Sequence, residues 1–395
     1  MTSSARGAAP WATAARDLFL VAMAVFVVNI VIGILNGADA VEFDRNQILT
    51  HVHAGTVGWL TLTIVASAFL LFRAADRRLM LALAVLVPVY VLAFYTGNFA
   101  FRAIGGVALL LAVAWLSVWI WQQYLGGDRS LPRLAVVLGL TTFAYGAVVG
   151  VLLQLQAALW TSFLPGDSIG AHAGAMTFGY IVLSAMGLIE WRVLGTTDMP
   201  RTGLVQVVAL FAGGLILSVA LLTGAAQAGG GLYLLASVIA MVLFAVRIWP
   251  TALRAGWLDA APARHIAAAS VWVVVAIAMF MYIVFTVITA PDPATAELPV
   301  NLLIASDHMV YIGVITNIVI GLLAALALRG DTLVRHVVFW GVNLGLLVFV
   351  VGLIADTADL KRIGAPVMGL VLLFALAVLA LRSWSEPLDE AALEA

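Results

Sequence analysis

The 395-residue chain contains no cysteine and a single lysine, and charged residues make up only 10% of it. The absence of cysteine excludes disulfides, thiolate-bound iron–sulfur clusters and thiolate-ligated haem. Any metal or haem must therefore rely on histidine, methionine, tyrosine or carboxylates. The formal net charge of −1 argues against a nucleic-acid partner. Soluble domains carry about 25% charged residues, so a chain that is 64% hydrophobic is expected to be an integral membrane protein.

Apolar stretches long enough to cross a bilayer recur along the whole chain, and each needs about 20 residues as a helix. Twelve such stretches predict an all-α, polytopic fold that forms one membrane domain over residues 1–395. The predicted spans cover about residues 17–36, 47–72, 79–97, 103–124, 133–157, 168–190, 202–224, 230–249, 265–289, 299–328, 335–355 and 364–383.

The basic residues predict the orientation of these spans, because cytoplasmic segments are enriched in lysine and arginine. With the N-terminus in the cytoplasm, the cytoplasmic segments hold fifteen of the nineteen basic residues. We therefore expect both termini in the cytoplasm, and a multi-pass protein in the lipid bilayer of a bacterial cytoplasmic membrane.

Four of the six histidines lie near the outer ends of spans 2, 6 and 10, and these are His51, His53, His172 and His308. An ionisable residue inside the membrane indicates a functional site by default, and neutral imidazole is a good ligand for iron and copper. A single buried histidine is more often a packing residue, but four at one depth favour a cofactor site. The other two, His265 and His336, adjoin arginines at inner helix ends and are expected to be solvated.

The three spans with these histidines are four spans apart, which predicts three four-helix units over about residues 17–124, 133–249 and 265–383. The strings "HAGTVGWLTL", "HAGAMTFGYIVL" and "HMVYIGVITN" are similar. The first two strings share "HAG", which makes His53 the counterpart of His172. His308 is a looser match, and His51 is the additional residue. Side chains two positions apart on a helix diverge by about 200°, so His51 and His53 are expected to serve two separate sites.

The glycines that follow the histidines closely have two explanations. They either clear room for a haem macrocycle or allow close packing between helices. The glycines concerned are Gly55, Gly58, Gly174, Gly179 and Gly313.

The twelve spans and the histidines on spans 2, 6 and 10 resemble subunit I of the haem-copper oxidase superfamily. The string "HVHAGTVGWLTL" is also similar to the H-x-H motif of cbb-type oxidases and nitric oxide reductases. The resemblance implies one or two b-type haems near the outer leaflet, with His308 and one of His51 or His53 as ligands. It places His172 where the family binds copper or iron.

The chain departs from that family in two places. Its H-x-H string lies on span 2 rather than span 10, and span 7 lacks the histidines that complete a three-histidine copper site. The resemblance therefore implies a divergent redox protein, active in electron transfer or in binding or reducing O2 or NO. As an enzyme it would be an oxidoreductase of the cytochrome c oxidase or nitric oxide reductase type, with a cytochrome c or a quinol as electron donor.

Four further residues near the outer side are candidates for supporting roles. Arg45 and Arg102 are outer-side cations suited to haem propionates. Asp307 and Tyr311 are near His308 and could support a ligand, although a wetted helix end and ordinary packing explain them too. Two other functions remain open: a secondary transporter whose histidines line a proton or substrate path, and a haem- or copper-handling membrane protein without turnover.

Overall fold

A computed structural model describes residues 9–195, 199–291, 296–327, 331–385 and 388. The described residues form helices and no strand, and twelve helical spans are long and apolar enough to cross a membrane. The predicted all-α, polytopic fold is therefore confirmed. Several helices extend beyond the predicted apolar runs; α1 begins at Pro10, a residue whose fixed φ suits the first turn of a helix.

Nine of the twelve spans are single helices within the described residues. They are α1 (Pro10–Gly37), α4 (Arg77–Tyr95), α5 (Phe99–Gly126), α6 (Leu131–Ala158), α9 (Arg201–Thr223), α10 (Ala226–Ala252), α11 (Ala263–Ile288), α14 (Thr332–Ile354) and α15 (Ala358–Ser385).

The other three spans are composite, because an eight-residue π-helical segment interrupts each of them. They are α2 (Arg45–His53), η1 (Ala54–Thr61) and α3 (Leu62–Phe72); α7 (Ser168–Gly174), η2 (Ala175–Val182) and α8 (Leu183–Leu194); and α12 (Val300–His308), η3 (Met309–Thr316) and α13 (Asn317–Ala327). We call these the central spans.

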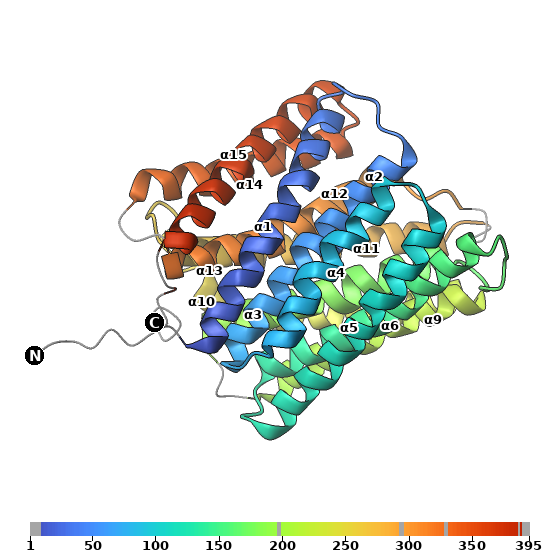
Figure 1. Ribbon diagram of the computed structural model, residues 1–395, viewed down its shortest axis with the longest axis horizontal. Helices are drawn as coiled ribbons and strands as arrows, with labels where there is room; N and C mark the ends of the chain where they lie inside the picture. The colour runs from blue at the N-terminus through green and yellow to red at the C-terminus, as the bar shows by residue number, and fades with distance from the viewer. Residues whose placement is uncertain (1–8, 196–198, 292–295, 328–330, 386–387, 389–395) are drawn as a thin grey trace, which may run out of the picture.

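The central spans form the core of the bundle. Their apolar windows are 89%, 83% and 89% buried, against 28–56% for the other nine spans. They contact one another through η1 with η3, η2 with η3, and α3 with α8. The remaining helices pack around them, and α1 lies against α15, so the first and last spans of the chain are neighbours (Figure 1).

Polar residues at the helix starts fix where several spans begin. The side-chain oxygens of these residues accept hydrogen bonds from backbone N–H groups in the first turn, which otherwise lack intrahelical partners. The capping residues are Asp44, Asp76, Asn98, Asp167 and Asp331. The cap at Asp44 also has Gln47 returning a bond to the Asp44 N–H, and it sets the start of the span that carries two histidines.

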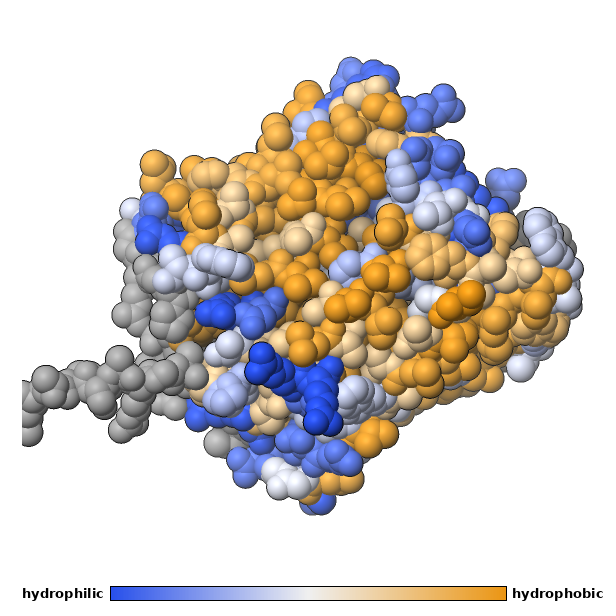
Figure 2. Space-filling model, in the orientation of Figure 1, coloured by the Kyte–Doolittle hydropathy of each residue, from blue (hydrophilic) through white to orange (hydrophobic). Residues whose placement is uncertain are grey.

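The side of the bundle is apolar and its two ends are hydrophilic (Figure 2). Large apolar side chains are exposed there, such as Ile104 at 70% and Val246 at 66%. An apolar surface of this extent is expected in contact with lipid tails rather than with water. We call the end that carries His51, His53, His172 and His308 the histidine end, and the opposite end the arginine end.

The predicted orientation can be tested with single cysteines, because the natural chain has none. Asp356 lies between α14 and α15 at the histidine end, and Asp128 lies between α5 and α6 at the arginine end; their side chains are 77% and 97% exposed. In intact bacterial cells we expect a membrane-impermeant maleimide to label Asp356→Cys at once and Asp128→Cys only after lysis. The reverse pattern would place the histidine end in the cytoplasm.

Candidate functional site

The four histidines of the histidine end share one hydrogen-bonding pattern. In each, Nδ1 lies 2.8–2.9 Å from a backbone carbonyl oxygen: Asn29 for His51, Leu49 for His53, Gly146 for His172 and Ile304 for His308. A carbonyl oxygen can only accept, so Nδ1 carries the hydrogen and Nε2 keeps its lone pair. No described residue hydrogen-bonds any of these Nε2 atoms, and all four side chains are only half-buried.

The two histidines of the arginine end are arranged differently. His265 is 2% exposed and donates through Nδ1 to Asn317 Oδ1 at 2.9 Å, whereas His336 Nδ1 accepts from Arg264 at 3.0 Å. The expectation that these two histidines are solvated is wrong for His265, and the neighbouring Arg264 is 0% exposed. The reason is that Arg264 packs over the Phe339 ring and donates to the Arg335 carbonyl, which buries the start of α11 beneath α14.

The four histidines fall into two kinds according to where their carbonyl partner lies. His51 and His172 bond to the preceding peripheral helix, α1 or α6, and we call them the cross-helix histidines. His53 and His308 bond to the carbonyl four residues earlier in their own helix, and we call them the same-helix histidines. Each same-helix histidine also contacts an aromatic ring of the next helix. The ring centroids are 3.6 Å apart for His53 and Phe94, and 4.9 Å apart for His308 and Phe349.

The π-helical segments place the two kinds in register. His53 and His308 each come immediately before a π-helical segment, whereas His51 lies three residues before the first residue of η1 and His172 three before that of η2. The structural counterpart of His172 is thus His51, and the match of His53 with His172 suggested by "HAG" is wrong. The sequence did not reveal this, because histidine stands at both positions 51 and 53. Only the place where the π-helical segment begins shows which of the two corresponds to His172.

One histidine of each kind lies near one of the other kind across two central spans. A charge on His172 would be felt at His53, and one on His51 at His308, which makes these the neighbouring histidines of different spans. The four histidines thus form two pairs, His51–His308 between the first and third central spans and His53–His172 between the first and second. His51 and His53 thus neighbour histidines of different spans, and their service to two separate sites stays a prediction.

The centre of the bundle holds the three spans in this register. Trp59 of η1 donates to Thr316 of η3 at 2.9 Å, and η2 also contacts η3. Thr61 and Thr316 each donate in turn to the carbonyl five residues earlier in their own π-helical segment, at 3.0 and 2.8 Å. These hydroxyls thus donate hydrogen bonds to carbonyls within the π-helical segments. Such segments are frequent at functional sites.

Two glycines that the sequence analysis did not single out leave room for the cross-helix histidines. A β-carbon on Gly33 would lie 3.0 Å from His51 Cε1, and one on Gly150 would lie 2.7 Å from His172 Cε1. Both glycines lie four residues, about one helical turn, after the residue whose carbonyl holds the histidine. By contrast, Gly58, Gly179 and Gly313 pack against α1, α6 and α11, so close helix contact explains them.

The two candidate arginines differ in their surroundings. Arg45 is exposed at the start of α2. Arg102 is 2% exposed and donates to Asn46 Oδ1 and the Phe94 carbonyl, both at 2.7 Å, and its guanidinium lies 4.7 Å from the centroid of the Phe94 ring that stacks on His53. No described carboxylate is within ion-pair distance of Arg102, so a buried cation lies beside the His53–His172 pair without an anionic partner.

Asp307 and Tyr311 link two central spans. The Tyr311 hydroxyl lies 3.2 Å from the Thr177 hydroxyl of η2, and the Asp307 carboxylate is near it. Nδ1 of His308 is already bonded to the Ile304 carbonyl, so Asp307 does not set the tautomer of that histidine. The two residues thus connect the second and third central spans rather than orient a ring nitrogen.

Within the described residues, no three histidines or carboxylates come close enough together to hold a metal ion. The donor set at the histidine end is instead two separate pairs of imidazoles. Two imidazoles with free Nε2 atoms are donors that would hold a haem, and the carbonyl bonds to Nδ1 are the contacts that usually orient such ligands.

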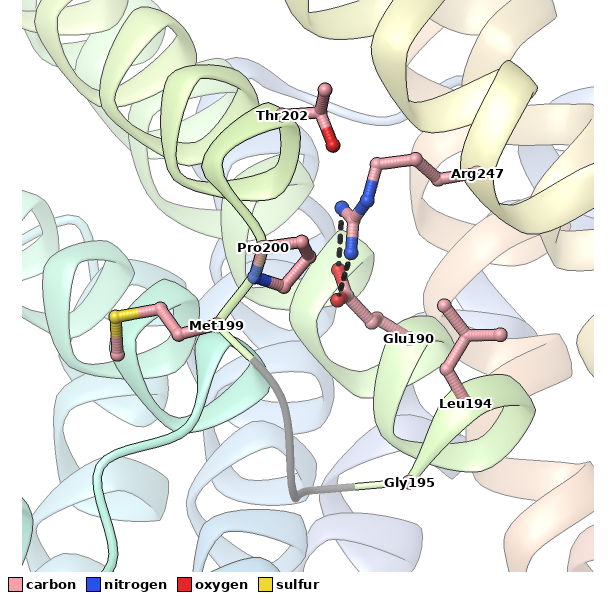
Figure 3. A pocket seen from close by; sticks show the side chains of 7 residues that line it. All are labelled: Glu190, Leu194, Gly195, Met199, Pro200, Thr202 and Arg247. Atoms are coloured by element: carbon pink, nitrogen blue, oxygen red, sulfur yellow. Dashed lines mark hydrogen bonds and ion pairs between the residues drawn. The ribbon is translucent and has the colours of Figure 1, made fainter.

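A different polar site lies at the arginine end, where a cavity of about 610 Å³ opens between α8, α9 and α10. Glu190 and Arg247, which line it, form a two-fold ion pair (Figure 3). Arg247 also donates to Gln206 Oε1 at 2.8 Å. Sequence reasoning missed this pair, although a glutamate in the apolar string "GLIEW" was a usable signal. The charges neutralise each other, so the pair connects α8 to α10.

We predict that Glu190→Gln lowers the thermal unfolding midpoint in detergent far more than Asp356→Asn does. Glu190 and Arg247 are 4% and 10% exposed, and removal of one partner of a buried pair costs about 3–5 kcal/mol. Asp356 pairs with Lys361 at the surface, where an ion pair contributes about 0–1 kcal/mol. Equal midpoints for the two variants would show that the Glu190–Arg247 pair does not stabilise the bundle.

No protein-family model and no curated protein matches the chain. The function must therefore be argued from the chain's own residues, and the two histidine pairs are the arrangement with the most specific chemistry.

Proposed function

We propose that the protein binds two b-type haems at the histidine end, one between His51 and His308 and one between His53 and His172. The observation that carries this proposal is the shared state of the four imidazoles. Each is half-buried, has Nδ1 fixed by a backbone carbonyl and leaves Nε2 free among the described residues. Histidines kept only for packing would be expected to use both ring nitrogens or to be fully buried.

The arrangement of each pair fits ligation from two sides. The two members come from different central spans, and one is held by a neighbouring helix while the other is held by its own. Two anchors of this kind fix the ring planes independently of any cofactor. Gly33 and Gly150 support the same assignment, because a larger residue at either position would displace a cross-helix histidine.

Electron transfer is the activity that these pairs support best. Held by two histidines, a haem would supply one-electron chemistry, and O2 or NO would have to displace an imidazole to bind it. Four carbonyl bonds hold the imidazoles in place and oppose such displacement. We therefore propose a membrane redox protein that passes electrons, a divergent relative of haem-copper oxidase subunit I, rather than a reductase of diatomic gases.

Arg102 gives the second pair a counter-charge for a haem carboxylate. A buried guanidinium without a carboxylate partner is costly in an apolar bundle, and a propionate group would supply the missing charge. Arg45 is exposed and has no comparable need for a partner. Because both pairs lie at the histidine end, we also propose that the electron donor, a cytochrome c or a quinol, reaches the protein at that end.

We predict that the purified protein has two low-spin haems per chain, with split α and β bands on reduction. His51→Ala and His308→Ala should each remove the same haem, whereas His53→Ala and His172→Ala should each remove the other. The combination His51→Ala/His308→Ala should lose no more haem than either single variant, but His51→Ala/His53→Ala should lose both. Haem content per chain and optical spectra measure each outcome.

His336→Ala is the matched control, because its Nδ1 accepts from Arg264 at the arginine end. It should keep both haems. A colourless parent protein would refute haem binding and favour the transporter alternative. A parent with haem in which His51→Ala and His53→Ala remove the same spectral component would refute the pairing.

Arg102→Gln should weaken retention of the haem at the His53–His172 pair and leave the other haem in place. A hydrogen bond to a charged group contributes about 1.5–3 kcal/mol, which corresponds to roughly ten- to a hundred-fold weaker binding. Arg45→Gln, at an exposed position, is the control and should change retention little. Haem transfer to excess apomyoglobin measures the rates of loss, and equal rates for the two variants would contradict a role for Arg102.

A further inference from the structure

By the register of the π-helical segments, the three central spans define three places, each of which combines a same-helix position of one span with a cross-helix position of another. Histidines fill both positions in two of these places. In the third, between the second and third central spans, the same-helix position is Gly174, directly before η2, and the cross-helix position is Ser306, three residues before the start of η3. We call Gly174 and Ser306 the third pair position.

The frame around the third pair position matches the frame of the two histidine pairs. Ser306 Oγ donates to the Ala276 carbonyl on the preceding helix α11 at 3.5 Å, as His51 and His172 donate to carbonyls of α1 and α6. A β-carbon on Gly174 would contact Leu217 of the next helix, α9, at 3.7 Å. The same-helix histidines likewise contact the helix that follows their own span.

The packing one turn below confirms that the three preceding helices share a register. The fifth residue of each π-helical segment is a glycine. Each glycine faces the residue that lies four positions before the one whose carbonyl accepts the hydrogen bond on the preceding helix. These contacts join Gly58 to Val25, Gly179 to Thr142 and Gly313 to Trp272.

One residue in this frame differs in size. Gly33 and Gly150 lie four residues after Asn29 and Gly146, whose carbonyls hold the cross-helix histidines. The residue four after Ala276 is Phe280. Phe280 thus occupies on α11 the position that Gly33 occupies on α1 and Gly150 on α6. At those two glycines, an added β-carbon would meet the imidazole of His51 or His172.

The Phe280 ring is packed into an aromatic cluster rather than left free. It stacks on Phe178 of η2 with the centroids 3.8 Å apart and meets Tyr233 of α10 edge-on at 5.7 Å. Ser306 is 0% exposed, whereas the histidines at the equivalent positions are half-buried. Aromatic packing beside α11 thus accompanies a fully buried Ser306, whereas the histidines at the equivalent positions stay partly accessible.

We infer that the third pair position is a third haem site of the same design, lacking both ligands and closed by Phe280. The residue at the Gly33, Gly150 and Phe280 positions then decides how many haems the bundle holds. This inference rests on the proposed haem function.

The direct test installs the missing features. Gly174→His and Ser306→His supply the two imidazoles, and Phe280→Gly supplies the space. We expect the triple variant to contain three haems per chain, by pyridine haemochrome and protein assay, against two for the parent, for Phe280→Gly alone and for Gly174→His/Ser306→His. A triple variant that elutes as a single species and keeps the two original haems without gaining a third would overturn the inference.

The reciprocal test does not depend on the triple variant folding. Gly33→Phe should close the His51–His308 site and Gly150→Phe the His53–His172 site, so that each variant keeps one haem instead of two. Val31→Phe and Val148→Phe are matched controls, because these residues lie on the same helices and are 42% and 44% exposed. Retention of both haems in the two glycine variants would overturn the inference.

Different results would refute the proposed haem function and the inference about the third pair position. A parent protein without haem refutes the proposed function, whatever the variants do. A parent with two haems whose number does not respond to these substitutions leaves the proposed function intact and refutes only the inference about the third position.

Discussion

The hydrogen bond from a histidine Nδ1 to a backbone carbonyl is the interaction on which the histidine end depends. An imidazole at membrane depth needs partners for two ring nitrogens, and an unpaired polar atom in an apolar bundle is costly. The carbonyls of Asn29, Leu49, Gly146 and Ile304 each satisfy one nitrogen and thereby fix the tautomer. The second nitrogen of each ring is left for a ligand, and all four rings leave the same one.

The carbonyls can do this because the bundle repeats one design three times. Each central span has a histidine-end helix, a π-helical segment and a second helix, and the preceding peripheral helix meets it in the same register. A repeated frame creates equivalent places, and individual residues decide what each place can hold. Glycine leaves room beside His51 and His172, whereas Phe280 stands at the corresponding position of α11 and packs on Phe178. On the proposed assignment, the number of haem sites depends on a few side chains rather than on the fold.

The sequence was sufficient to predict the twelve spans and the four histidines, because hydropathy and rare polar residues in apolar runs are strong signals. It could not predict the pairing. The "HAG" match aligned His53 with His172, but η1 and η2 align His51 with His172, and a π-helical segment has no residue signature that would show this. The carbonyl partners were also out of reach, since any residue supplies a carbonyl. The buried state of Arg102 depends on contacts with Asn46 and Phe94, which are distant in the sequence or on another helix.

The central claim is that the four histidines act as two ligand pairs, and an experimental density map of the purified protein tests it most directly. The account predicts two macrocycles at the histidine end, one with its iron between the Nε2 atoms of His51 and His308 and the other between those of His53 and His172. The third pair position should contain only the packed rings of Phe178, Phe280 and Tyr233. A map without macrocycles, or one in which His53 and His308 hold the same iron, would contradict the account.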